Sequence, residues 1–338
     1  MSYPKRRELI QEIARLRNSR VVSYFTGDRE NISTRIAPDA LPVIYRHLRA
    51  RPAAPRIDLF LYTRGGDVLT PWRLVHLIRE FAPFFGVLVP YRAYSAGTLI
   101  CLGADEIVMG TLGELGPIDP SVVNAFNPED PHNPAARIPV NVEDVYSYLA
   151  LAREEAGLSS EQHMAQVFLR LAALIHPLAL GNVHRNYLLV RSLAKRLISL
   201  RVNAPPPEHV QHIVDSLTEQ LYAHNHMISR REAADDIGLP VARPDGRLET
   251  IMWELFQDYR DELAIDRPFN PAELLRGNRC EFEVPGGFIE SDIGQDVFTF
   301  SGAVERRNHP EGVQVNVDIL HQGWCPGWRG WNVEHGQQ

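Results

Sequence analysis

Two short segments, "TRGGD" and "YSAG", hold the residues whose types and spacing suit acyl-transfer chemistry. In the first, Gly65 and Gly66 follow a strand-like run, and adjacent glycines let backbone N–H groups approach a ligand with no side chain in the way. In the second, Ser95 lies between a strand-like and a helix-like run, which places the Ala96 N–H at a helix start. A hydroxyl beside two such N–H groups has the parts of a nucleophile and an oxyanion hole. We therefore predict Ser95 as the nucleophile and Gly65, Gly66 and Ala96 as the source of the oxyanion hole.

Each segment by itself also fits a purely structural role. A serine at a helix start is usually an N-cap, and a glycine pair after a strand is usually a turn. The order of the two segments favours chemistry, because each one ends a strand and begins a helix. The partial positive charge of a helix N-terminus would also favour an oxyanion beside Ser95.

A serine needs a base to take its proton, and the sequence offers several candidates. The only lysines are Lys5 and Lys195, and Lys195 is the interior one, where burial can lower a lysine pKa into a useful range. His184 and His176, in "IHPLALGNVHR", compete with it. All three also fit the role of ordinary helix side chains. Asp119, in "GPIDP", could orient a base or belong to a turn.

Alternating strand-like and helix-like patterns surround these segments. Such alternation predicts an α/β domain with largely parallel strands. The strands are expected at 20–28, 56–67, 85–94 and 105–110, and the helices at 6–19, 38–50, 69–82 and 95–104.

The second half of the chain is expected to be helical before it turns to strands. Residues 124–140, rich in Pro and Asn, are expected to form a loop, and Pro177 and Gly181 to break or kink a long helix. From about 278 the pattern changes to short antiparallel strands that end in a Trp- and Gly-rich segment. Further helices are expected at 141–157, at 161–200, up to about 222, at 229–239 and at 247–263.

Composition excludes several classes of function. Hydrophobic residues make up 44% and charged residues 23%, and the net charge is −7 without a basic block, so a nucleic-acid partner is not expected. No run of 18 apolar residues and no signal-peptide core are present, which predicts no membrane span and a cytoplasmic location. The three cysteines form no CxxC pair, and His224 and His226 have no further ligand at metal spacing, so no metal site is expected. The sequence contains no GxGxxG fingerprint, so a dinucleotide cofactor is not expected.

The ordered segments "LFLYTRGGDVLTPWRLVHLI" and "VPYRAYSAGTLICLGADEIVMG…LGPIDP" resemble the Clp protease/crotonase superfamily, in particular its serine dehydrogenase proteinase-like family. The resemblance is strongest over 20–122, has an echo at 224–241 and does not extend past about 275. It implies Ser95 as nucleophile, Gly65, Gly66 and Ala96 at the oxyanion hole, a homo-oligomer, and no metal or organic cofactor.

The resemblance also bears on the base. In the Clp proteolytic subunit a histidine follows the nucleophile helix, but here that region, "TLGELGPIDPSV", has none. Relatives of signal peptide peptidase A use a lysine instead, which favours Lys195. His184 lies near the place where relatives of the family carry a lysine.

The expected fold is therefore α/β, a Clp/crotonase-type spiral of β-β-α units with added helices and a small C-terminal β-rich appendage. Residues 1–20 would form an N-terminal helix, 20–275 the peptidase domain with a helical extension at about 141–265, and 276–338 the appendage. The expected function is hydrolysis of peptide bonds in a peptide or protein substrate. The alternatives are an inactive oligomeric scaffold and a crotonase-type acyl-CoA enzyme. The Trp-rich C-terminus could bind a protein partner or pack within the appendage.

Overall fold

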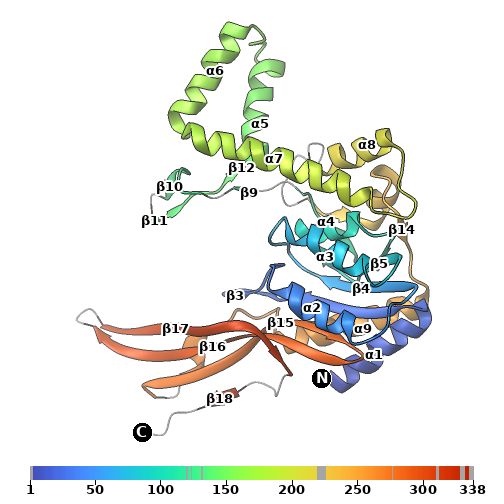
Figure 1. Ribbon diagram of the computed structural model, residues 1–338. Helices are drawn as coiled ribbons and strands as arrows, with labels where there is room; N and C mark the ends of the chain where they lie inside the picture. The colour runs from blue at the N-terminus through green and yellow to red at the C-terminus, as the bar shows by residue number, and fades with distance from the viewer. Residues whose placement is uncertain are drawn as a thin grey trace.

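A computed structural model describes residues 3–118, 121–122, 124–130, 132–218, 226–275, 277–309, 312–327 and 332–334 (Figure 1). In these ranges, nine strands form one central sheet in the order β14-β7-β5-β4-β1-β15-β16-β17, and β18 pairs with β15. The strands from β14 to β1 run parallel and the later ones antiparallel, which confirms the mixed α/β class. The bounds are β1 Arg20–Thr26, β4 Arg56–Tyr62, β5 Phe84–Val89, β7 Glu106–Met109, β14 Val241–Ala242, β15 Arg279–Ser291, β16 Gly294–His309, β17 Gly312–Pro326 and β18 Asn332–Glu334.

Helices cover both faces of the parallel part of the sheet (Figure 1). In β1 and β4 every residue after the first is buried, as expected of strands that pack on two sides. Neighbouring side chains alternate between the two cores: Tyr24 and Leu61 point to one, Phe25 and Tyr62 to the other. The first core includes α2 (Ala40–Arg49), α3 (Thr70–Arg79) and α4 (Ala96–Leu102), and the second α1 (Tyr3–Arg17) and α9 (Gly246–Glu262).

A small second sheet lies at the ends of the parallel strands, in the order β13-β8-β6. β6 (Arg92–Ala93) follows β5 and precedes α4, which makes one strand-strand-helix unit of the kind that the resemblance implies, and β8 (Glu114–Leu115) follows β7. β13 (Ile228–Ser229) comes from much later in the chain and pairs antiparallel with β8.

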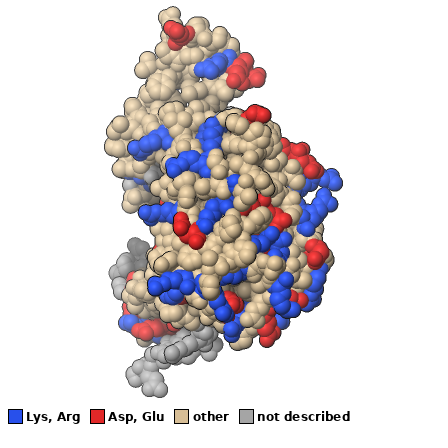
Figure 2. Space-filling view, turned by 45° about the vertical axis from the view of Figure 1, so that its right-hand side comes forward, with Lys and Arg blue, Asp and Glu red and all other residues tan. Residues whose placement is uncertain are grey.

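A helical arm projects from the body (Figure 1). Its outer helix α6 has no buried residue, so even the large apolar side chains of Phe168 and Leu169 are exposed. Charged side chains are sparse over the arm and mixed in sign over the body on the face that Figure 2 shows. The arm and the helix beside it comprise α5 (Val142–Ala150) with the π-helical turn η1 (Leu151–Glu155), α6 (Glu161–Leu174), α7 (Pro177–Ile198) and α8 (Pro207–Thr218).

The break between α6 and α7 is at Pro177, as predicted, and the two helices are bent there by 108°. Gly181 lies inside α7, so the prediction of a break there is wrong. A single glycine still makes the backbone hydrogen bonds of an α-helix, so α7 continues through this position. Among the described residues, no single helix has the length and hydropathy to cross a membrane. Helices α6 and α7 meet these two criteria only when they are taken together, as a bent pair.

The predicted loop at 124–140 is wrong in part, because it contains a hairpin of β10 (Glu129–Asp130) and β11 (Asn133–Arg137). Side chains support the backbone near this turn: Asp130 Oδ1 accepts from the His132 N–H at 2.8 Å. The other short elements are β2 (Asp28–Arg29), β3 (Ile32–Ser33), β9 (Ser121–Val122), β12 (Val140–Asn141), the π-helical turn η2 (Glu232–Asp236) and the 3₁₀ turn η3 (Pro271–Leu274).

The antiparallel strands expected near the C-terminus are present, and they continue the central sheet. β15 pairs with β1 from Val22 to Thr26, and β16 and β17 extend beyond the body (Figure 1). Trp324 packs with its ring centroid 6.2 Å from that of Tyr24 and 5.4 Å from that of Phe298, so this tryptophan belongs to the sheet's own packing. Trp328 and Trp331 lie outside the described residues.

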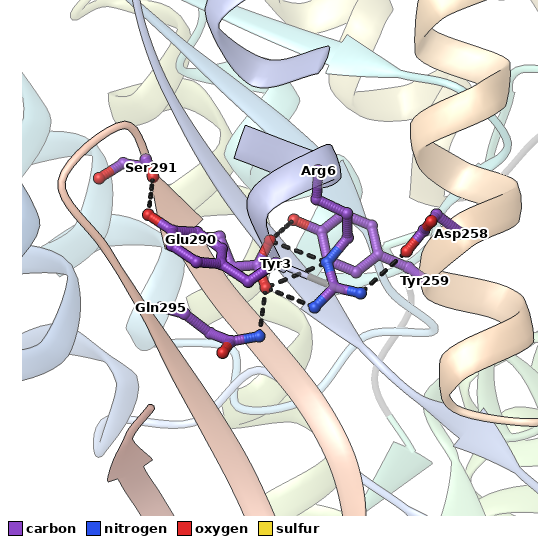
Figure 3. A network of polar contacts seen from close by, with 7 residues as sticks. All are labelled: Tyr3, Arg6, Asp258, Tyr259, Glu290, Ser291 and Gln295. Atoms are coloured by element: carbon purple, nitrogen blue, oxygen red, sulfur yellow. Dashed lines mark hydrogen bonds and ion pairs between the residues drawn. The ribbon is translucent and has the colours of Figure 1, made fainter. Parts of the chain in front are cut away.

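A buried polar network ties α1 and α9 to β15 (Figure 3). Arg6 of α1 is 1% exposed, and its guanidinium donates to Asp258 at 2.8 Å and to Glu290 at 2.9 Å. Tyr259 and Gln295 also donate to Glu290, both at 2.8 Å. Because two carboxylates, a guanidinium and their hydrogen bonds are fully enclosed, the network fixes how the N-terminal helix seats on the sheet.

The cysteines give a simple check of the packing. Cys101 lies fully buried in α4, burial raises its pKa to about 12, and Cys280 is also buried, whereas Cys325 is partly exposed. The thiolate is the reactive form, so we expect N-ethylmaleimide to modify Cys325 in the native protein at a pH of about 8 and to leave Cys101 unmodified until denaturant is added. Peptide mass spectrometry of the alkylated protein measures this, and early modification of Cys101 would contradict the described core.

Candidate functional site

Ser95 stands just before α4 in a conformation that a helix cap does not require. Its backbone has φ 51° and ψ −107°, and its side chain makes no capping hydrogen bond. A non-glycine residue held at positive φ stores strain on the order of 1–3 kcal/mol and persists where its surroundings fix it. The Gly97 N–H donates to the Tyr94 carbonyl at 2.8 Å and the Leu99 N–H to the Ser95 carbonyl at 3.0 Å, which secures the turn. The hydroxyl is therefore available for another role.

The first glycine of the pair, Gly65, lies directly against this serine. A Cβ atom on Gly65 would come within 3.0 Å of the Ser95 Cβ, and its φ of 109° also suits glycine. A Cβ atom on Gly66 would lie 2.1 Å from the Ile36 carbonyl oxygen, so no side chain fits there either. The structure thus brings Gly65 against Ser95, as the sequence predicted, and Gly66 follows it with its backbone packed against Ile36.

The two glycine N–H groups are not equivalent. The Gly65 N–H donates to Thr63 Oγ1 at 3.0 Å and is therefore occupied. The N–H groups of Gly66 and Ala96 have no hydrogen-bond partner among the residues that the structure describes. Of the predicted oxyanion-hole residues, Gly66 and Ala96 are thus the ones with donors to offer.

The small sheet brings a histidine to Ser95 from far along the chain. β6 ends shortly before Ser95, and β13 begins shortly after His226, with β8 between the two strands. Both residues line one cleft of about 330 Å³. The other residues that line it are Arg64, Arg92, Tyr94, Gly116, Pro117 and Met227.

His226 is held by a carboxylate. Its Nε2 lies 2.7 Å from Glu232 Oε1, and its side chain is 37% exposed. Glu232 begins η2, where its backbone N–H donates to Ser229 Oγ at 3.3 Å. With Nε2–H donated to Glu232, the Nδ1 atom of His226 remains as a proton acceptor. A serine, a histidine and a carboxylate are the three parts of nucleophilic catalysis.

The sequence-predicted bases lie elsewhere. Lys195 is half-buried on α7, and neither it nor His184 lines the Ser95 cleft. His184 is exposed, with Nδ1 at 2.6 Å from the Tyr146 hydroxyl. His176 caps α7. Asp119 and His224 lie outside the described residues.

From the sequence alone, His226 was weighed only as a metal ligand and was not among the predicted bases. The signal that could have identified it is the echo of the family pattern at 224–241, where a histidine is followed by "SRREA". Within the described ranges, no cluster of three or more His, Cys, Asp or Glu side chains could hold a metal ion.

Comparison with known proteins finds matches to the part of the chain that contains Ser95. Residues 2–130 match the family described as ClpP-like SDH-type serine proteinase. The uncharacterized protein MJ0137 of Methanocaldococcus jannaschii is 33% identical over 128 residues, which cover 35% of this chain and 43% of that relative. The uncharacterized protein MJ1495 of the same organism is 32% identical over 124 residues, or 35% of this chain and 42% of the relative.

The chain thus spans less than half the length of these curated relatives. The matched segment carries Gly65, Gly66 and Ser95, while His226 and Glu232 lie beyond it. The resemblance to this family is confirmed: over residues 2–130 this chain matches the ClpP-like SDH-type serine proteinase family.

Proposed function

We propose that the protein is a serine peptidase that cleaves peptide bonds through an acyl-enzyme on Ser95. The observation that carries this proposal is the shared cleft of Ser95 and His226, with His226 hydrogen-bonded to Glu232. The family match over residues 2–130 supports the same chemistry. We further propose that the protein works as a homo-oligomer on a peptide or protein substrate, as the Clp-like family suggests.

The proposed steps use the side chains of Ser95 and His226 in the cleft together with the backbone N–H groups of Gly66 and Ala96. His226 Nδ1 takes the proton as Ser95 Oγ attacks the peptide carbonyl, and the Glu232 carboxylate stabilises the imidazolium that forms. The N–H groups of Gly66 and Ala96 donate to the tetrahedral oxyanion. His226 then returns the proton to the leaving amine, and a water molecule activated by His226 hydrolyses the ester and frees Ser95.

A fluorophosphonate probe tests the nucleophile. We expect the probe to label the native protein at Ser95, located by peptide mass spectrometry, because an activated serine attacks phosphorus as it attacks a carbonyl. Ser95→Ala is expected to abolish labelling. Ser192→Ala, an exposed serine on α7, serves as the matched control and should label like the wild type.

The outcomes separate the alternatives. A folded wild-type protein that resists the probe would favour the inactive scaffold, and equal labelling of wild type and Ser95→Ala would rule out this nucleophile. Binding of an acyl-CoA thioester without any labelling would favour the crotonase-type chemistry, in which the oxyanion hole acts without a serine.

A further inference from the structure

We propose that the Ser95 cleft selects substrates with a carboxylate close to the scissile bond, and that Arg64 and Arg92 bind this carboxylate. The inference rests on the proposed peptidase function and names its substrate class. The residues that line the described cleft include two arginines and a histidine but no aspartate or glutamate. An anionic group of the substrate would therefore meet cations and no opposing carboxylate at the cleft wall.

Arg64 has hydrogen-bond donors to offer. It directly precedes the glycine pair, its side chain is 58% exposed, and its nearest acid, Asp28, lies 3.7 Å away, which is beyond hydrogen-bond length. The Tyr62 hydroxyl donates to the same carboxylate of Asp28 at 2.9 Å. Asp28 therefore attracts Arg64 but accepts no hydrogen bond from its planar fork of N–H groups.

Arg92 is held more firmly and in the same cleft. Its guanidinium stacks over the Tyr91 ring, 4.2 Å from the centroid. Its Nε lies 3.5 Å from Glu114 Oε2, an ion pair longer than a hydrogen bond. The Tyr94 hydroxyl also donates to Glu114, so that carboxylate serves two partners. Burial and the nearby Glu114 raise the Tyr94 pKa, which keeps the tyrosine a neutral donor.

The two guanidiniums suit a carboxylate of a peptide substrate. Arginine presents parallel N–H donors that match the two oxygens of a carboxylate, and partial shielding from water strengthens such pairs. Basic and acidic side chains are mixed over the body surface in Figure 2, so this preference would be local to the cleft. The carboxylate could come from a Glu or Asp side chain or from a peptide C-terminus.

Binding of fluorescein-labelled peptides to the Ser95→Ala variant tests the inference without requiring catalysis. Three peptides that differ at one residue and at the C-terminus distinguish the sources of the carboxylate. The first has Glu and an amidated C-terminus, the second has Gln and an amidated C-terminus, and the third has Gln and a free C-terminal carboxylate. We expect at least one of the acidic peptides to bind roughly tenfold more tightly than the Gln amide, as measured by fluorescence anisotropy.

The arginine variants complete the test. Arg64→Gln and Arg92→Gln, each in the Ser95→Ala background, should reduce the preference for the acidic peptide about tenfold. Arg51→Gln should keep it, because Arg51 is a similarly exposed arginine that pairs with Asp292 and does not line the cleft. Tighter binding of the Glu amide assigns a side-chain carboxylate, and tighter binding of the free acid assigns a C-terminus.

Equal affinity for all three peptides, or a preference that survives both arginine variants, would overturn the inference. That result would leave the peptidase proposal standing if the wild-type protein is labelled at Ser95. If the wild-type protein is not labelled by the fluorophosphonate at Ser95 but the preference for acidic peptides is present, the peptidase proposal is refuted and the acidic-peptide binding site is retained.

Discussion

Replacement of His226 by glutamine is expected to slow fluorophosphonate labelling of Ser95 on the order of a thousandfold. Glutamine keeps a polar side chain of similar size but cannot take the serine proton. The rate is measured under pseudo-first-order conditions by gel fluorescence, with circular dichroism to confirm the fold. Glu232→Gln should also slow labelling, by up to about ten-thousandfold, because a glutamine amide can hold His226 in the tautomer that has no acceptor for the serine proton.

The matched controls for this prediction are the bases that the sequence favoured. Lys195→Met and His184→Gln should label at the wild-type rate, because neither residue lines the cleft. His184→Gln also matches the His226 substitution in chemistry, and His184 is likewise held by a single side chain, Tyr146. If Lys195→Met or His184→Gln stops labelling while His226→Gln does not, the assignment of His226 is wrong and the sequence-based candidate is right.

Replacement of Arg6 by alanine is expected to lower the free energy of unfolding by about 3–5 kcal/mol. The substitution leaves the carboxylates of Glu290 and Asp258 buried without their cation, since both side chains are fully buried (Figure 3). It also removes a guanidinium that packs over the Tyr259 and Phe288 rings at 5.1 and 4.7 Å. Guanidinium chloride unfolding, followed by far-ultraviolet circular dichroism, measures the change.

Arg7→Ala is the control for this experiment. Arg7 is the next residue on α1 and is exposed, so its loss should change the unfolding free energy by no more than about 0.5 kcal/mol. Equal midpoints for the two variants would mean that the network adds nothing to stability. A selective effect of Arg6→Ala would show that the N-terminal helix is anchored to β15 through these charges.

Local patterns in the sequence predicted most of the fold. The buried strands β1, β4, β5 and β7 and the helices between them follow from apolar runs and helical spacing, which depend on neighbours in the chain. The errors came where local signals were weak. The hairpin at 129–137 has little apolar content, and a single glycine at 181 did not end its helix.

The sequence by itself identified the half of the candidate site that carries the proposed nucleophile. Gly65, Gly66 and Ser95 lie in short segments that end one element and begin the next, so their chemistry can be predicted from adjacent residues. A local contact that the residue pattern did not reveal occupies the Gly65 N–H: it donates to Thr63 Oγ1, two residues earlier, which leaves Gly66 and Ala96 as donors. Tertiary structure alone placed His226 in the cleft, because β13 pairs with β8, and that pairing joins segments far apart in the chain through backbone hydrogen bonds that no local pattern specifies.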